Sequence, residues 1–218
     1  MAFIIYYIFI TSMSNSDSST LLHCKISKYS QSITTSIRCI CFKYLFAFFI
    51  IDMTTVYSVG LSIFSQNGGM VSNGQGIRIA TEAVTEQDLG DVWLIPGGWG
   101  TRPLANDERF LVLLRQIAEK SEYCLTVCTG SALLAKCGAL DGRRATSNKI
   151  AFDWVVTMSD KVSWIYDARW VEDGKFFTSA GVSAGIDMAL GFVSHLRGEK
   201  EAENIARKME YTWNRGRG

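Results

Sequence analysis

Short apolar runs alternate with glycines along most of the chain, from about residue 53 onward. Residues 91–95 (DVWLI) form an apolar run that Pro96-Gly97-Gly98 stops, which is typical of a buried parallel strand entering a tight loop. Asp107 or Asn106 can cap the helix that follows, because apolar residues recur with helical spacing at 110, 111, 114, 117 and 118. Residues 123–127 predict the next strand, and a second helix follows it at once.

Further strands are expected at 54–61, 77–80, 164–170 and 175–178. The last two flank Asp173-Gly174, a dipeptide that favours a hairpin turn. Two closing helices are expected at 183–196 and 199–213. Alternation of strands and helices predicts an α/β protein: a three-layer sandwich with a mainly parallel sheet and helices on both faces.

The first 52 residues break this pattern. Residues 1–11 are an apolar run about half as long as a membrane span requires. Residues 12–43 are rich in Ser, Thr, Ile and Lys and contain no glycine. We therefore divide the chain into an atypical segment, 1–52, and a well-specified domain, 53–218. The segment is expected to be partly disordered, or to replace or truncate the first strand; residues 3–10 have the period of a strand.

Charge and cysteine content narrow the function classes. The formal net charge of +1 gives no electrostatic reason to expect nucleic acid or a membrane surface as a partner. The six cysteines include no C-x-x-C pair, and the chain has two histidines, so neither a metal site nor a cofactor is expected. A reduced, cytoplasmic protein that acts on a small molecule is the preferred interpretation.

Candidate chemistry is concentrated at Cys128. An apolar strand ends at this cysteine, and the next residues are Thr129, Gly130 and other small residues that begin a helix. Such a sharp turn exposes a nucleophile at the carboxyl end of a sheet, and the helix N-terminus is expected to lower the pKa of the thiol. Gly130 would let substrate or neighbouring backbone approach. The alternative is a buried structural cysteine, which we expect Cys124 and Cys137 to be.

Four segments in order closely resemble the ThiJ/PfpI family, and most of all its isonitrile-hydratase-type branch. The resemblance covers about residues 53–213 and implies the flavodoxin-like fold of the class I glutamine-amidotransferase-like superfamily. The segments are residues 95–102 (IPGGWGTR), 127–131 (VCTGS), 140–146 (LDGRRAT) and 178–190 (TSAGVSAGIDMAL).

The resemblance implies a role for each matching residue. Cys128 would be the nucleophile, and the N–H groups of Thr129 and of Gly97 or Gly98 would form an oxyanion hole. The hydroxyl of Thr129 would hydrogen-bond substrate or a catalytic water. Gly130 would border the pocket.

Two further residues of these segments are expected beside the site. Arg102 would anchor its loop through an ion pair, which is a structural role. Trp99 would either line the mouth of the pocket or pack on a neighbour at the surface.

The sequence departs from the family pattern in two places. Many relatives carry a histidine where this chain has Asn148, and asparagine cannot act as a general base. Family members also present an acidic residue to the nucleophile from their first strand and loop. Asp17 and Asp52 are the acids in 1–52, and neither has a matching context. His195 is expected to be a structural or surface histidine, and His23 has no assigned place.

Two functions remain open. The first is a cysteine-dependent enzyme resembling isonitrile hydratase, or a related hydrolase or lyase, in which an isonitrile gains water and becomes an N-substituted formamide. The second is a non-catalytic redox-sensing or ligand-binding module that has lost its catalytic acid. A glutaminase is disfavoured, because the late His-x-Glu pair of that class is absent: Leu196 and Arg197 follow His195. A homodimer is expected, as in many relatives.

Overall fold

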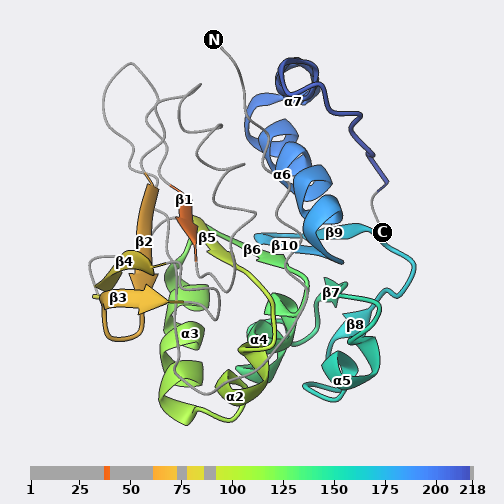
Figure 1. Ribbon diagram of the computed structural model, residues 1–218. Helices are drawn as coiled ribbons and strands as arrows, with labels where there is room; N and C mark the ends of the chain where they lie inside the picture. The colour runs from red at the N-terminus through yellow and green to blue at the C-terminus, as the bar shows by residue number, and fades with distance from the viewer. Residues whose placement is uncertain (1–36, 40–60, 73–77, 86–91, 217–218) are drawn as a thin grey trace.

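A computed structural model describes residues 37–39, 61–72, 78–85 and 92–216. Its described strands form an eight-stranded sheet in the order β3-β4-β2-β1-β5-β6-β10-β9, which is parallel except at the two edge strands, β3 and β9 (Figure 1). The strands are β1 Ile37–Cys39, β2 Leu61–Ser65, β3 Gly69–Ser72, β4 Arg78–Ala83, β5 Val92–Ile95, β6 Tyr123–Val127, β9 Trp170–Asp173 and β10 Phe176–Ser179.

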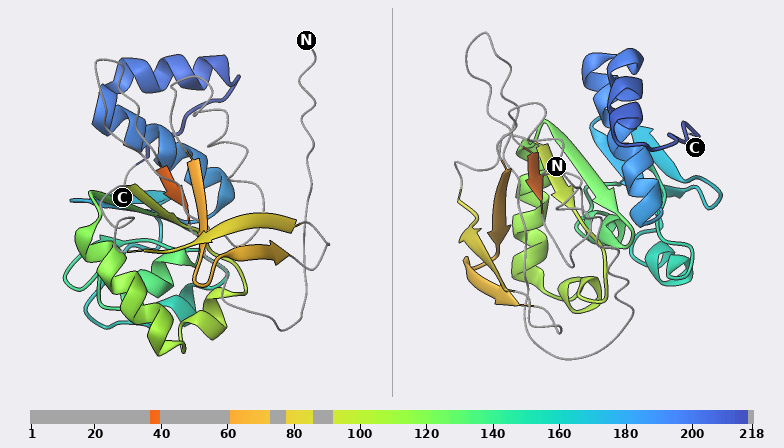
Figure 2. Two further views of the ribbon diagram at one scale, coloured as in Figure 1. Left: turned by 90° about the vertical axis from the view of Figure 1, so that its left-hand side faces the viewer. Right: turned by 45° about the horizontal axis from the view of Figure 1, so that its top comes forward.

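Helices cover both faces of this sheet. Helices α3 and α4 lie on one face, whereas α6 lies on the other with α7 packed on its outer side (Figures 1 and 2). The expected α/β sandwich is therefore confirmed. The described helices are α2 Thr101–Leu104, α3 Glu108–Lys120, α4 Gly130–Lys136, α5 Phe152–Val156, α6 Val182–Arg197 and α7 Glu199–Lys208.

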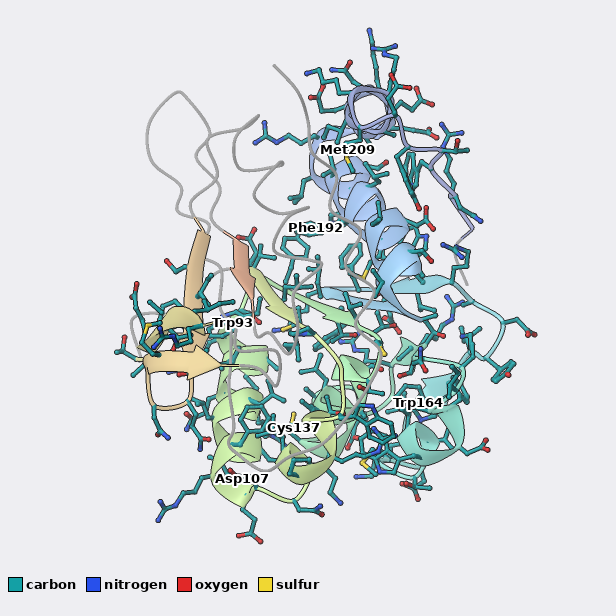
Figure 3. The ribbon with its side chains drawn as sticks, in the orientation of Figure 1. Trp93, Asp107, Cys137, Trp164, Phe192 and Met209 are labelled. Atoms are coloured by element: carbon teal, nitrogen blue, oxygen red, sulfur yellow. The ribbon has the colours of Figure 1, made fainter. Side chains whose placement is uncertain are left out.

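Strand β5 shows why its residues form an unbroken apolar run. Trp93 packs among residues of α3 and α4, whereas Leu94 packs against residues of α6 that include Phe192 (Figure 3). All four residues of the strand are buried. A strand buried on both faces has no solvent side, so it carries no polar alternation.

Strand β1 occupies a central position in the sheet. Ile37–Cys39 pairs in parallel with β2 on one side and β5 on the other. These residues belong to the stretch that the sequence pattern marked as atypical, so the sheet extends to the N-terminal side of residue 53. The strand expected at 3–10 lies outside the described residues, and the division at 52/53 stays a prediction.

Local signals located most elements of the domain. Asp107 caps α3, because its Oδ1 accepts the Phe110 N–H at 3.0 Å. The Asp173-Gly174 hairpin joins β9 to β10 as predicted. The first hairpin strand was placed too early, since residues 163–164 form a separate short strand, β8 Ser163–Trp164, that pairs with β7 Arg144–Ala145. In the described part of the chain, every helix is too short or too polar to cross a bilayer.

Candidate functional site

Cys128 forms the turn between β6 and α4. Its backbone has a φ of 57°, in the left-handed region that residues with a side chain seldom adopt. Its N–H donates to Ser179 O in β10 at 2.9 Å, and its carbonyl accepts from Ser147 Oγ at 2.9 Å and from Ser131 Oγ at 3.3 Å. Three segments therefore hold the strained conformation that a nucleophile elbow requires.

Two glycines allow the loop after β5 to lie directly against this turn. A Cβ atom at Gly130 would collide with the carbonyl oxygen of Ile95. A Cβ atom at Gly97 would collide with the Thr129 nitrogen and come within 2.8 Å of the Cys128 Cβ. A glycine is thus needed at 130 because the Ile95 carbonyl leaves no room for a side chain. The glycine at 97 lets its own peptide group lie beside Cys128.

The side chain of Thr129 is buried and holds the same loop. Its Oγ1 accepts the Gly98 N–H at 2.9 Å and lies 3.1 Å from Thr101 Oγ1. The Gly98 N–H therefore already has an acceptor, which leaves Gly97 as the glycine that could pair with the Thr129 N–H in an oxyanion hole. The Thr129 hydroxyl was expected to face substrate or water, and it is instead engaged within the protein.

The thiol of Cys128 is half-buried, and burial raises its pKa above the ordinary value of 9.0. Hydrogen bonds from the backbone N–H and the hydroxyl of Thr129, and the charge of Arg102, lower the pKa but do not offset burial. The expected lowering of the pKa is therefore wrong, because loss of solvent around the sulfur outweighs the donors at the start of α4. The thiol, not the thiolate, is the favoured form at neutral pH.

Arg102 lies beside the elbow without the predicted ion pair. Its guanidinium carbon is 4.2 Å from the ring centroid of Trp99 and 4.6 Å from that of Trp154. No carboxylate among the described residues pairs with it. The anchoring interaction is a cation–π contact with two indoles. Trp99 is 70% exposed and packs on Arg102. This is the second of the two predicted positions, at the surface against a neighbour.

Asn148 has a structural role near the site. Its Nδ2 donates to Ala180 O at 3.2 Å, and its Oδ1 accepts the Ile150 N–H at 3.1 Å. The preceding residue, Ser147, contacts the Cys128 carbonyl and was not singled out from the sequence. Only its place in the Ala145-Thr146-Ser147 stretch, which begins in β7, could have drawn attention to it.

His195 lies away from Cys128, beside the first residue of β6. Its Nδ1 is 2.9 Å from Glu172 Oε1 and its Nε2 is 3.2 Å from the hydroxyl of Tyr123. Cys128 follows the other end of the same strand, so His195 is a structural histidine, as expected. His23, Asp17 and Asp52 lie outside the described residues. The described residues include no cluster of three His, Cys, Asp or Glu side chains that could hold a metal ion.

Two curated proteins are similar to this chain over about three fifths of their own lengths. The isonitrile hydratase of Pseudomonas putida is 38% identical over 142 residues, which are 65% of this chain and 61% of that protein. Protein DJ-1alpha of Drosophila melanogaster is 32% identical over 133 residues, 61% of this chain and 59% of that protein.

Solved structures show the same fold. The crystal structure of a ThiJ/PfpI family protein from Pseudomonas syringae superposes with a TM-score of 0.63 at 28% identity, covering 74% of this chain and 67% of that one. The model of the DJ-1/PfpI family matches residues 46–195, which is more than half of the chain and includes the elbow. The chain therefore belongs to the DJ-1/PfpI family.

Proposed function

We propose that this protein is a cysteine-dependent enzyme that hydrates an isonitrile to an N-substituted formamide. The observation that supports this best is the elbow itself: Cys128 at a φ of 57°, with the backbone of Gly97 packed against it. Similarity to an isonitrile hydratase supports the choice of reaction among those that a half-buried thiol can perform.

The raised pKa of Cys128 suits this chemistry, because the thiol would bring both the nucleophile and a proton. Addition of S–H to the terminal carbon of R–N≡C forms the C–S and C–H bonds and gives the thioimidate R–N=CH–S–Cys128. Water then adds to that carbon, the C–S bond breaks, and the sulfur recovers its proton. The products are R–NH–CHO and the free thiol. The net reaction converts R–N≡C and water to R–NH–CHO.

Other groups at the elbow would assist these steps. When water attacks the thioimidate carbon, negative charge develops on the nitrogen. The N–H groups of Thr129 and Gly97 would hydrogen-bond this nitrogen. The described free cysteines Cys124, Cys128 and Cys137 agree with a reduced, cytoplasmic protein. A homodimer that binds a small molecule and no nucleic acid completes the proposal.

The test is formamide formation from an alkyl isonitrile by the purified protein. The wild type is expected to turn over, and Cys128→Ala is expected to lose at least about a thousandfold in rate, because the covalent step is removed. Cys137→Ala is the matched control and should retain turnover, since this thiol lies in the core. Equal rates for the wild type and Cys128→Ala, or no turnover by either, would contradict the proposal.

A redox sensor is the second candidate. It is favoured by Asn148, which stands where relatives carry histidine and cannot act as a general base; its side chain makes structural hydrogen bonds instead. In that case, peroxide should add one or two oxygen atoms to Cys128 in a wild type that shows no isonitrile turnover. Intact-mass and peptide mass spectrometry distinguish the two functions on one preparation.

A further inference from the structure

Among the described residues, the guanidinium of Arg102 is held beside the elbow by aromatic rings only. Trp99, in the loop after β5, and Trp154, in α5, lie on it at 4.2 and 4.6 Å. Indole rings attract the cation but accept none of its N–H groups in the plane of the guanidinium. The five N–H donors therefore keep their hydrogen-bonding capacity.

Arg102 differs in this respect from the other half-buried arginine of the described residues. Arg169 binds Asp187 through its Nε at 2.9 Å. Arg102 makes neither an ion pair nor a side-chain hydrogen bond with the described part of the chain. A half-buried guanidinium normally has a carboxylate or carbonyl partner, because an unpaired charge loses solvation on burial. A half-buried arginine that has no such partner among the described residues, and that lies next to a nucleophile, points to a ligand.

The position of Arg102 relative to Cys128 is fixed by the first turn of α2. Thr101 Oγ1 lies 3.1 Å from Thr129 Oγ1, and Thr129 directly follows the cysteine. Arg102 follows Thr101, so this contact and the packing of Gly97 against Cys128 place the segment that carries Trp99 and Arg102 next to the cysteine. The charge of Arg102 is the weakest of the influences that lower the pKa of Cys128. A small molecule attached at the sulfur would extend along this segment.

We propose that Arg102 is the anchor for a carboxylate group of the substrate, so that this protein acts on anionic small molecules. The inference rests on the proposed function for the reacting group, which would be an isonitrile that carries a carboxylate. The planar guanidinium suits the two oxygens of a carboxylate, and Trp99 and Trp154 hold it in place. Lysine could supply the charge but not this geometry.

Alkylation of Cys128 by two matched reagents tests the anchor without any need for turnover. Iodoacetate and iodoacetamide present the same reacting carbon and differ in charge. Both require the thiolate, so a change in the thiol pKa cancels in the ratio of their rates. Arg102→Met is expected to lower the iodoacetate-to-iodoacetamide ratio about tenfold, the effect of removing one charged contact that is partly screened. Arg102→Lys should give an intermediate ratio.

The matched control is Arg109→Met, which removes an exposed arginine of α3 and should leave the ratio unchanged. Salt gives a readout that needs no variant. Added salt should raise the ratio for a free thiol such as N-acetylcysteine, because its thiolate and iodoacetate repel one another. The ratio for Cys128 in the wild type should fall instead. A ratio unchanged in folded Arg102→Met, or a wild-type ratio that rises with salt, would overturn the proposal.

Turnover assays separate the anchor from the proposed function. Isocyanoacetate should be hydrated about tenfold faster, in kcat/KM, than its methyl ester by the wild type, and no faster by Arg102→Met. Equal turnover of both compounds by the wild type would refute the anchor and keep isonitrile hydration. Turnover of neither, with the alkylation ratio still dependent on Arg102, would refute isonitrile hydration and keep the anchor.

Discussion

At the scale of single residues, the site is built by contacts that hold a strained cysteine. A positive φ at a residue with a side chain costs on the order of 1–3 kcal/mol. The hydrogen bonds of Ser147, Ser131 and Ser179 to the Cys128 backbone contribute roughly 0.5–1.5 kcal/mol each, enough to offset that cost. Thr129 likewise holds the loop after β5, because its hydroxyl accepts the Gly98 N–H.

Thr129→Val should destabilise the protein by about 1–3 kcal/mol, because the part-buried Gly98 N–H would lose its acceptor, which a buried side chain supplies. Thr129→Ser keeps the oxygen and should cost less than about 1 kcal/mol. Urea unfolding measures both free energies. Loss of the loop's support should also slow alkylation of Cys128 in the folded Val variant. Equal stability of the Val and Ser variants would show that the hydroxyl does not hold the loop.

At the scale of elements, the sequence predicted those helices, strands and turns whose positions depend on residues close together in the chain. The strand before Cys128, the cap of α3 and the hairpin at Asp173-Gly174 follow from local composition, and the structure confirms them. The position of Ile37–Cys39 in the sheet follows from pairing with strands far along the chain, which no local signal reports.

Within the site, too, local sequence signals did not report contacts between residues far apart in the chain. An apolar strand, a cysteine and a following helix predicted the elbow, but the pKa of Cys128 depends on how much protein surrounds the sulfur. The contact of Arg102 with Trp154 joins residues about fifty positions apart. An ion pair was the reasonable expectation for an arginine, and the structure replaces it with contacts to Trp99 and Trp154.

Helix α6 carries a buried carboxylate that ties the C-terminal segment to the sheet. Asp187 is fully buried and accepts from Arg169 Nε at 2.9 Å, from the Tyr211 hydroxyl at 3.0 Å and from the Asn214 N–H at 2.8 Å. Burial, followed by the charge of Asp187, raises the pKa of Tyr211 to about 12. The Asp187 side chain thus joins α6 to the residue just before β9 and to the residues after α7.

Asp187→Asn should destabilise the protein by about 2–4 kcal/mol, because Arg169 loses its partner and the amide cannot accept as many hydrogen bonds. The pKa of Tyr211 should fall toward its ordinary value of 10, which absorbance titration of the tyrosinate measures. The control Asp160→Asn, at an exposed turn, should change neither quantity. An unaltered Tyr211 titration in Asp187→Asn would mean that burial alone sets this pKa.

At the scale of the whole molecule, two core thiols link folding to pH. Cys124 and Cys137 are buried on the α3–α4 side of the sheet, and burial raises the pKa of each to about 11 from an ordinary 9.0. Their sulfur atoms contact Ser121 Oγ and the Leu134 carbonyl respectively. In the unfolded chain both thiols would titrate near the ordinary value, so the two states bind different numbers of protons above pH 9.

Folding stability should therefore fall as pH rises from about 9 to 11. In that range the unfolded chain releases protons that the folded core retains, so deprotonation favours unfolding; the contribution is fully present below pH 9 and lost above the folded-state pKa. Each thiol contributes up to about 3 kcal/mol, since one pKa unit is about 1.4 kcal/mol. Urea midpoints across this pH range should decline less steeply in Cys124→Ala and Cys137→Ala than in the wild type, whatever the cavity costs at neutral pH. Parallel declines would mean that other groups cause the alkaline loss, and that the α3–α4 core does not exclude solvent from these sulfurs.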